Sequence, residues 1–365
     1  MTQVALAGGG TTGHIAPLIA TAEALLEVEP TAGLVCVGTP RGLESRVVPA
    51  AGLDLELIAP TPWPRRLDRD LITLPPRLIA AVAQARRLLR RHRCQVVVGF
   101  GGYASLPVFL AARLLGLPLI CHEANAVPGL ANRVAARLGA GVAVTFANTG
   151  LPRQRVIGLP LRSAIAELDR SAARPEARRT FDLPPSGRVV LVSGGSQGAQ
   201  RLNQAVSAAR ADLMAAGWSI LHVTGANHID QAGPAEGDSA GPCYRPLAYV
   251  DQMAQAYAAA DLMVGRAGAA TVVELACLGL PAVLVPLPHG NGEQAKNAAG
   301  LVGAGGAVLI EDAEFDADRL TGQLAELVAQ PETLPAMARA GLALMPRDAA
   351  ARLADWALEA AHRRK

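Results

Sequence analysis

The chain has 365 residues and a formal net charge of +3; 51% of the residues are apolar, 18% charged and only 3% aromatic. This length predicts two domains, each with its own core of small aliphatic side chains, and so small a charge favours no particular class of partner. The five cysteines are scattered without a C-x-x-C pair. That pattern argues against a disulfide scaffold or a zinc site, and it favours a reducing cytosol.

No membrane-spanning segment is expected. The amino terminus lacks the basic and apolar regions of a signal peptide. Residues 94–112 and 275–292 contain no Asp, Glu, Lys or Arg, but glycines and prolines interrupt both stretches. They therefore predict short strands with turns rather than helices that cross a bilayer.

The first half of the chain alternates buried strands with amphipathic helices. An apolar strand at residues 4–7 is followed by a glycine loop and by a helix with apolar positions Leu18, Ala22 and Leu25. Such alternation favours βαβ units and a parallel sheet. Further strands are predicted at residues 34–38, 95–103, 117–125, 141–146 and 155–158.

The same plan then restarts. Residues 188–206 again predict a strand, a glycine loop and a helix, and further strands are expected within 219–225, 262–276 and 281–288. We expect two doubly wound, Rossmann-like α/β domains that face one another across a cleft, connected by residues 158–178. The expected boundaries are 1–160 for the N-terminal domain, 161–348 for the C-terminal domain, and 349–365 for a helix that packs back on the first domain.

The first loop carries Gly8, Gly10 and Gly13 at the G-x-G-x-x-G spacing of dinucleotide-binding proteins. An NAD site needs an acidic residue near the end of the second strand, but the first acid after that strand is Glu44, which comes too late. No G-x-x-x-x-G-K-[ST] motif occurs, which excludes a P-loop NTPase. A tight turn without a ligand is the alternative for the first loop. The second glycine loop, at residues 193–199, favours a diphosphate instead, because helix N-termini bind anions.

Several polar residues lie at predicted loop–helix junctions. His14 can transfer protons near neutral pH, although a capping or buried structural histidine is the alternative. Residues 266–274 predict a loop entering a helix, where backbone N–H groups suit an anion and Glu274 suits a ribose diol. The alternative for Glu274 is a first-turn glutamate that the helix dipole favours. Gln294 and Asn297 can bind sugar hydroxyls or simply cap a helix.

In order along the whole chain, the segments "GGTTGHIAP", "VVGFGGYASLP", "HEANAVPGLANR", "GLPLR", "GGSQGAQRLN", "YVDQM", "RAGAATVVELA" and "EQAKNA" closely resemble the MurG family. That family consists of inverting glycosyltransferases of the GT-B type. The resemblance implies an α/β fold of two Rossmann-like domains. It also implies transfer of N-acetylglucosamine (GlcNAc) from UDP-GlcNAc to undecaprenyl-diphospho-N-acetylmuramoyl-pentapeptide, with no metal and no cofactor.

The resemblance assigns roles residue by residue. His14 is the implied general base, and the acceptor side is formed by Gly101, Gly102 and Tyr103. The implied donor-binding residues are Thr11, Thr12, Gly13, Asn125, Arg162, Ser196, Val250, Ala269, Ala270, Thr271, Val272, Val273, Glu274, Gln294 and Asn297. The chain departs from the family pattern at Thr12, Ala124, Leu159 and Glu293, and Glu293 leaves the choice of sugar open.

The implied reaction is a single displacement. The C4 hydroxyl of the acceptor attacks the anomeric carbon opposite UDP and gives a β-1,4 bond, while a base takes the hydroxyl proton. Two D-x-D triplets, at residues 68–70 and 316–318, follow no apolar strand and are interpreted as solvated surface. The alternatives are a UDP-GlcNAc epimerase, a lipid glucosyltransferase, or a nucleotide-sugar-binding module without catalysis.

Residues 65–93 hold nine arginines and two aspartates, a net charge of +7, together with apolar Leu74, Leu78, Ile79 and Val82. Basic and apolar side chains together are typical of a membrane-surface patch, and no aromatic residue interrupts them to stack on nucleic-acid bases. The alternative is an ordinary helix packed on the sheet. With the resemblance, this segment implies a peripheral enzyme on the cytoplasmic face of an anionic membrane, with a place in cell-wall synthesis, cell shape and division.

Overall fold

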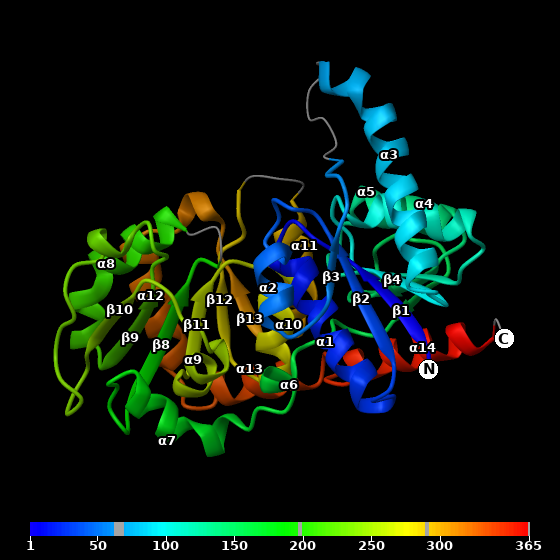
Figure 1. The fold of residues 1–365 in the computed structure, drawn as a ribbon. Coiled ribbons are helices and arrows are strands. Elements are labelled where there is room, and N and C mark those ends of the chain that lie inside the picture. Colours follow the sequence, from blue (N-terminus) through cyan, green and yellow to red (C-terminus); the bar gives the residue numbers. More distant parts are fainter. Residues whose placement is uncertain (62–68, 196–198, 289–291, 364–365) are drawn as a thin grey trace. The chain divides into compact units, whose positions relative to one another are not determined.

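The computed structural model describes residues 1–61, 69–195, 199–288 and 292–363. The chain divides into two compact units (Figure 1). Unit 1 consists of Met1–Arg162 and Pro346–Lys365, and unit 2 of Ser163–Met345.

Seven strands in the described part of unit 1 form one parallel sheet in the order β3-β2-β1-β4-β5-β6-β7. The strands are β1 (Gln3–Ala7), β2 (Gly33–Gly38), β3 (Leu55–Leu57), β4 (Val96–Gly99), β5 (Leu119–Glu123), β6 (Gly141–Val144) and β7 (Gln154–Val156). The helices are α1 (Thr12–Val28), α2 (Glu44–Ala50), α3 (Arg69–Arg91), α4 (Ser105–Leu114), α5 (Leu130–Arg137) and α14 (Ala349–His362).

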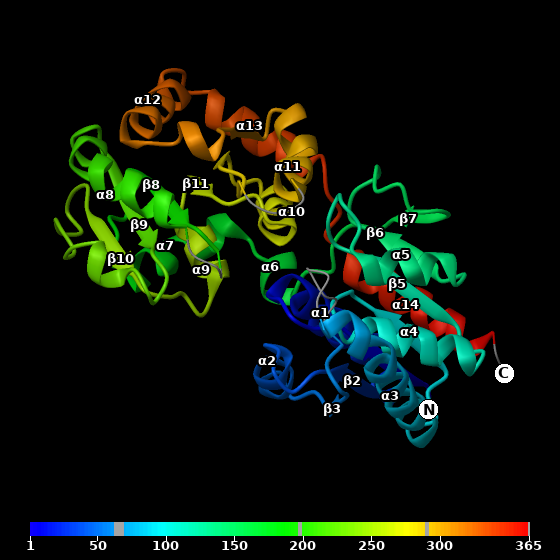
Figure 2. The same cartoon turned by 90° about the horizontal axis from the view of Figure 1, so that it is seen from above.

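Both faces of this sheet are buried, because successive strand residues point to opposite sides. Val4 and Leu6 face a cluster that includes Leu25 of α1 and Leu353 of α14, and Figure 2 shows α1 and α14 on the same side of the sheet. Ala5 and its neighbours face a second cluster with residues of α3 and α4. The sheet is therefore covered by helices on each side.

Unit 2 has a six-stranded parallel sheet among its described residues, in the order β10-β9-β8-β11-β12-β13. The strands are β8 (Arg188–Ser193), β9 (Trp218–Val223), β10 (Tyr244–Leu247), β11 (Leu262–Gly265), β12 (Ala282–Leu284) and β13 (Ala307–Leu309). The α-helices are α6 (Ser163–Ala166), α7 (Arg170–Thr180), α8 (Gln200–Ala215), α9 (Met253–Ala259), α10 (Ala269–Leu278), α11 (Glu293–Gly303), α12 (Ala317–Val328) and α13 (Thr333–Leu342).

The prediction of two Rossmann-like parallel-sheet domains is confirmed. Three strands, β3, β10 and β13, were not predicted, and each lies at the edge of a sheet. None of the described helices combines the length and apolarity needed to span a bilayer.

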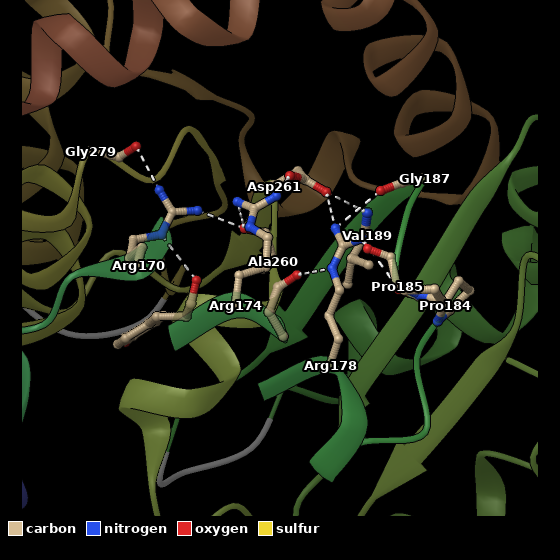
Figure 3. Close-up of polar contacts among 12 residues, drawn as sticks. Arg170, Arg174, Arg178, Pro184, Pro185, Gly187, Val189, Ala260, Asp261 and Gly279 are labelled. Atoms are coloured by element: carbon tan, nitrogen blue, oxygen red, sulfur yellow. Dashed lines mark hydrogen bonds and ion pairs between the residues drawn. The ribbon is translucent and has the colours of Figure 1, made fainter. Parts of the chain in front are cut away.

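The segment predicted to connect the domains, residues 158–178, is only partly a connection. Its larger part, from Ser163 onward, belongs to unit 2 and includes α7. Arg170 of α7 donates to the carbonyls of Tyr257, Ala260 and Gly279, and Arg174 forms an ion pair with Asp261 (Figure 3). The helix is thus an integral part of unit 2.

Candidate functional site

The register of the unit 1 sheet brings its glycine loops to one edge. Ala7 of β1 pairs with Val37 of β2 and with Gly99 of β4, so the three strands end together. Their following loops share the carboxyl edge of the sheet, where open α/β folds bind ligands.

The first glycine loop touches the loop that follows β4, which contains Gly101 and Gly102. Gly101 and Gly102 have φ of +91° and +81°, a conformation that favours glycine. A Cβ built on Gly102 would lie 2.1 Å from the Gly9 carbonyl oxygen. Only a glycine at this position allows the loop after β4 to approach the first glycine loop so closely.

His14 is half-buried in the first turn of α1, three residues after the N-cap residue Thr11. Its Nδ1 is 3.1 Å from the Gly9 carbonyl oxygen and 3.3 Å from the Thr11 hydroxyl. Because a carbonyl can only accept, we assign the proton of the neutral ring to Nδ1, which leaves a lone pair on Nε2. A Cβ on Gly101 would lie 3.2 Å from that Nε2, so the loop after β4 lies directly against this edge of the imidazole. This arrangement suits a general base.

Other predicted residues of unit 1 surround this point. Thr11 and Thr12 are exposed, and Gly13 is half-buried. Tyr103, which directly follows Gly102 in the loop after β4, is 44% exposed. The Thr61 hydroxyl donates to the Tyr103 carbonyl over 3.3 Å, which fixes the backbone there. The structure thus brings the predicted base and the predicted acceptor-side loop together.

Asn125 lies half-buried on the loop after β5, and a buried carboxylate organises that loop. Glu123 is 2% exposed and accepts from the backbone N–H groups of Asn125 and Gly129 and from the Asn132 side chain, all over 2.9 Å. Glu123 and Asn132 stood in quoted motifs, but sequence reasoning gave them no role. A carboxylate at the very end of a buried strand was the available signal.

His122, next to Glu123, is fully buried and donates from Nε2 to the Gly158 carbonyl over 2.9 Å. Burial lowers the pKa of His122 to about 4, although the hydrogen bond to Gly158 opposes that shift. His122 is therefore neutral at physiological pH and does not compete with His14 as a proton acceptor.

Glu44, the acidic residue that comes too late in the sequence to bind a ribose, is buried and accepts a hydrogen bond from the first glycine loop. It is 1% exposed, and its carboxylate accepts from the Gly10 N–H over 2.9 Å and from the N–H and hydroxyl of Thr39 over 2.9 and 2.8 Å. Burial opposes its ionisation, but these hydrogen bonds outweigh burial and lower the pKa of the Glu44 carboxyl. The first glycine loop therefore donates to a carboxylate of its own chain.

In unit 2, β8, β11 and β12 also end together, since Gly265 pairs with both Ser193 and Leu284. The helix α10 begins at this edge with Gly268 as its N-cap. The Val272 N–H bonds the Gly268 carbonyl over 3.0 Å, so the amides of the preceding turn have no partner within the helix. The residues of that turn are Ala269, Ala270 and Thr271. They form an N-terminal dipole end that suits an anion.

The next two predicted residues of α10, Val272 and Val273, have fully buried side chains and belong to the core. Glu274 follows one turn into the helix and is half-buried. Its Oε2 accepts a hydrogen bond from the Tyr257 hydroxyl over 2.7 Å. Tyr257 was not identified from the sequence.

Gln294 and Asn297 both reach the loop between β11 and α10. Gln294 Oε1 accepts from the N–H groups of Ala267 and Leu287 over 3.2 and 2.9 Å, so a sugar hydroxyl would meet its amide nitrogen. Asn297 is 1% exposed, and its Nδ2 lies 3.5 Å from the Ala267 carbonyl. Asn297 therefore lies beneath the loop rather than on its surface.

Arg266 anchors the same loop, a role that sequence reasoning missed. It is 8% exposed, donates to the carbonyls of Val285 and Pro286 over 3.2 Å each, and pairs with Asp312 over 2.6 Å. The ends of β11 and β12 are joined through this guanidinium, which holds the start of α10 in place.

The remaining predicted donor residues are Arg162, Val250 and Ser196. Arg162 is exposed at the end of unit 1, and Val250 is 8% exposed after β10. Ser196 lies outside the described residues.

No group of three or more His, Cys, Asp or Glu within the described ranges could hold a metal ion. Of the two D-x-D triplets, Asp68 lies outside those ranges. Asp316 caps α12 by accepting from the Arg319 N–H over 2.8 Å. The second triplet therefore begins with a helix cap.

Comparison with known proteins gives a family for both halves of the chain. Residues 4–144 match the glycosyltransferase family 28 N-terminal domain, and residues 189–353 match its C-terminal domain. A curated protein of Nocardioides sp. is 52% identical, with 98% of each chain covered, and one of Acidothermus cellulolyticus is 50% identical, with 100% of this chain and 99% of the relative covered. Both are named UDP-N-acetylglucosamine–N-acetylmuramyl-(pentapeptide) pyrophosphoryl-undecaprenol N-acetylglucosamine transferase.

Solved structures agree. The crystal structure of Acinetobacter baumannii MurG is similar with a TM-score of 0.77 at 27% identity, covering 98% of this chain and 100% of that one. The calicheamicin glycosyltransferase CalG4 is similar with a TM-score of 0.70 at 17% identity, covering 100% and 99%, which supports the fold alone.

Proposed function

The chain belongs to glycosyltransferase family 28 and, within it, to the MurG family of N-acetylglucosamine transferases, and from this membership we propose its reaction. It transfers GlcNAc from UDP-GlcNAc to undecaprenyl-diphospho-N-acetylmuramoyl-pentapeptide, which makes the lipid-linked disaccharide of peptidoglycan synthesis. Near-complete coverage at about 50% identity by relatives of that name carries this conclusion. The same names favour it over an epimerase, a lipid glucosyltransferase or a non-catalytic module.

We propose that unit 1 performs the acceptor chemistry. His14 Nε2 takes the proton of the C4 hydroxyl as that oxygen attacks the anomeric carbon from the face opposite UDP. The bond to the anomeric carbon forms as the bond to the UDP oxygen breaks, so the configuration inverts and a β-1,4 link results. The position of Gly101 beside Nε2, with Gly102 and the exposed Tyr103 next in the chain, supports this role.

Unit 2 holds the donor in this proposal. The amides of Ala269, Ala270 and Thr271 stabilise the departing diphosphate with fixed dipoles, and Glu274 accepts from the ribose hydroxyls. Gln294 offers its amide nitrogen to the sugar. Asn125 and Arg162, on unit 1, contribute only if the two units close on one donor, and the cleft between the domains stays a prediction.

The cellular setting is also a proposal. The acceptor is lipid-linked, and we infer a peripheral enzyme at the cytoplasmic face of an anionic membrane. The support is α3, where Arg86, Arg87 and Arg90 are exposed and Ile79 is 70% exposed. A supply of wall precursor from this surface would make cell shape and division depend on the enzyme.

The test is release of UDP from UDP-GlcNAc by the purified chain, with and without the lipid-linked muramoyl-pentapeptide. We expect release only with the acceptor, together with a lipid product heavier by one N-acetylhexosamine. An acceptor that lacks the C4 hydroxyl should give neither. UDP release that ignores the acceptor would contradict the proposal and favour an epimerase or a hydrolase.

A further inference from the structure

Two hydrogen bonds of the first glycine loop belong to one peptide group. The N–H of Gly10 donates to Glu44 Oε2 over 2.9 Å, and the carbonyl of Gly9 accepts from His14 Nδ1 over 3.1 Å. These two atoms are the opposite poles of the Gly9–Gly10 peptide bond. In a trans peptide the N–H and the C=O point in opposite directions, so the group can connect a carboxylate on one side with an imidazole on the other.

The surrounding glycines leave room for this chain of contacts. A Cβ on Gly9 would lie 2.4 Å from Glu44 Oε1, and one on Gly42 would lie 1.9 Å from Glu44 Oε2. A Cβ on Gly102 would strike the Gly9 carbonyl oxygen at 2.1 Å. Side chains at these three positions would displace either the carboxylate or the carbonyl. These clashes explain why all three positions are glycine, without reference to a bound nucleotide.

We propose that Glu44 is a positioning residue for His14 that acts through the Gly9–Gly10 peptide group. The carboxylate, the peptide and the imidazole form one hydrogen-bonded chain, which keeps the proton of neutral His14 on Nδ1 and leaves Nε2 as the acceptor. Glu44 does not touch substrate. This inference rests on the proposed role of His14 as the base.

The direction of polarisation follows from the charges. A carboxylate that accepts from the peptide N–H draws positive charge toward that end and makes the carbonyl oxygen a stronger acceptor, because hydrogen bonds in series polarise one another. A stronger acceptor at Nδ1–H stabilises the imidazolium that forms when Nε2 takes the hydroxyl proton. During the step the proton moves from the acceptor oxygen to Nε2, the proton on Nδ1 stays in place, and Glu44 remains ionised.

Several other groups face this chain. The Thr11 hydroxyl shares His14 Nδ1 at 3.3 Å, and Thr39 holds the second oxygen of Glu44. His122 interacts with His14 electrostatically but is buried and neutral. Glu123 accepts a hydrogen bond from the Asn132 side chain. Asn132 and His14 both lie close to Gly101. Among these groups, Glu44 is the carboxylate joined to His14 through a single peptide group.

The direct test is ¹⁵N NMR of the full chain labelled in histidine, with the His14 signals assigned by their loss in His14→Ala. In the wild type, neutral His14 should show a protonated Nδ1 and an unprotonated Nε2. In Glu44→Gln, which keeps the size of the side chain but removes its charge, the His14 signals should move toward a mixture of the two tautomers. Glu29→Gln is the matched control, since Glu29 also accepts a backbone N–H, from Thr2, at the far end of α1.

Kinetics then separate positioning from simple structural support. Glu44→Gln should lower kcat by about tenfold, less than the 10²–10⁴-fold worth of a general base, with KM for UDP-GlcNAc unchanged. The acid limb of the kcat/KM profile should move to lower pH, because His14 without the relayed charge is a weaker base. A structural role alone would lower activity without moving that limb.

The outcomes distinguish this inference from the proposed function. A protonated Nε2 in neutral wild-type His14 overturns the inference without any variant, even if Glu44→Gln does not fold. Unchanged His14 signals in Glu44→Gln overturn it as well, and so does a tautomer change that leaves kcat and the pH profile intact. Normal turnover in His14→Ala would instead remove the base itself, whatever the NMR shows.

Discussion

At the scale of single residues, one phenol sets the orientation of the carboxylate proposed to bind the ribose. Tyr257 is 2% exposed, and its hydroxyl donates to Glu274 Oε2 over 2.7 Å. Burial and the neighbouring Glu274 charge raise the pKa of Tyr257 well above its usual value, so the phenol stays a donor. A carboxylate held in this way loses less rotamer freedom when a diol binds.

Tyr257→Phe should therefore weaken UDP binding by about 0.5–1.5 kcal/mol, the usual net worth of one hydrogen bond. Glu274→Ala should cost more, about 1.5–3 kcal/mol, because it removes the charged acceptor itself. Calorimetric titration with UDP and with 2′,3′-dideoxy-UDP checks both values. If either variant loses the same affinity for both ligands, its effect does not pass through the ribose hydroxyls.

His14, Glu274 and both glycine loops could be predicted from the sequence, because each stands inside a contiguous motif next to a strand end. Their supporting partners could not. Glu44 is 34 residues from Gly10, and Tyr257 is 17 residues from Glu274. Which side chains meet across such separations depends on the order of strands and the packing of helices, and a single sequence does not state these.

At the scale of elements, the central strands were predictable, and of the four edge strands only β7 was. The central strands are continuous apolar runs, since both faces of a parallel sheet are buried. The edge strands β3 and β10 read Leu-Glu-Leu and Tyr-Arg-Pro-Leu, are only partly buried, and are three and four residues long. Such short runs carry little periodicity. Most of α7 lies within residues 158–178, the segment that was predicted to connect the two domains.

Arg170, Arg174 and Arg178 of α7 instead donate to backbone carbonyls (Figure 3). Arg178 is 3% exposed, donates to the carbonyls of Ala259, Pro185 and Gly187, and pairs with Asp261 over 3.0 Å. Arg178→Met should destabilise the chain by about 3 kcal/mol, because several backbone carbonyls lose their donor and the half-buried Asp261 loses one of its two arginine partners.

Urea unfolding followed by circular dichroism measures that loss. Arg179→Met is the matched control, since Arg179 is exposed and pairs only with Glu176 on the helix surface among its described contacts. It should change stability by less than about 0.5 kcal/mol. Equal effects of the two substitutions would mean that the contacts of Arg178 contribute no more to stability than those of an arginine on the helix surface.

The helix α3 has one face in the core and one face in solvent, and its role at a membrane stays a prediction. Ala81, Ala85 and Leu89 pack in the core, whereas Ile79 is 70% exposed and the arginines at 86, 87 and 90 face solvent. Each exposed arginine contributes about 1 kcal/mol near an anionic surface, and this attraction falls off within about 8 Å at physiological salt. Binding to anionic vesicles should therefore weaken as salt rises, and Arg86, Arg87 and Arg90→Ser together should remove the salt-sensitive part.

Ile79→Ser should reduce the binding that persists at high salt, because burial of an apolar side chain is not screened. Matched controls remove the same charge or the same apolar area elsewhere: Arg179, Arg319 and Arg339→Ser in unit 2, and the exposed Val28→Ser at the end of α1. Vesicle sedimentation is the measurement. If the controls weaken binding as much as the α3 variants, α3 is an ordinary surface helix.

At the scale of the whole molecule, the proposed reaction uses two similar sheets, one for the acceptor chemistry and one for donor binding. Each sheet ends three central strands in register and opens a glycine-rich edge, but the edges differ in chemistry. Unit 1 fills its loop with the carboxylate of Glu44 and presents His14. Unit 2 presents the open N-terminus of α10 with Glu274 behind it. The proposed base therefore lies on one unit and the proposed anion-binding site on the other.

The most direct measurement is single-turnover transfer of labelled GlcNAc from UDP-GlcNAc to the lipid-linked muramoyl-pentapeptide, compared between the wild type and His14→Ala at saturating substrates. We expect a β-1,4-linked product from the wild type. In the variant, transfer should be slower by roughly 10²–10⁴-fold, while calorimetric affinity for UDP stays the same. Transfer at the wild-type rate by His14→Ala, or loss of UDP binding in that variant, would contradict the division of base and donor site between the two units.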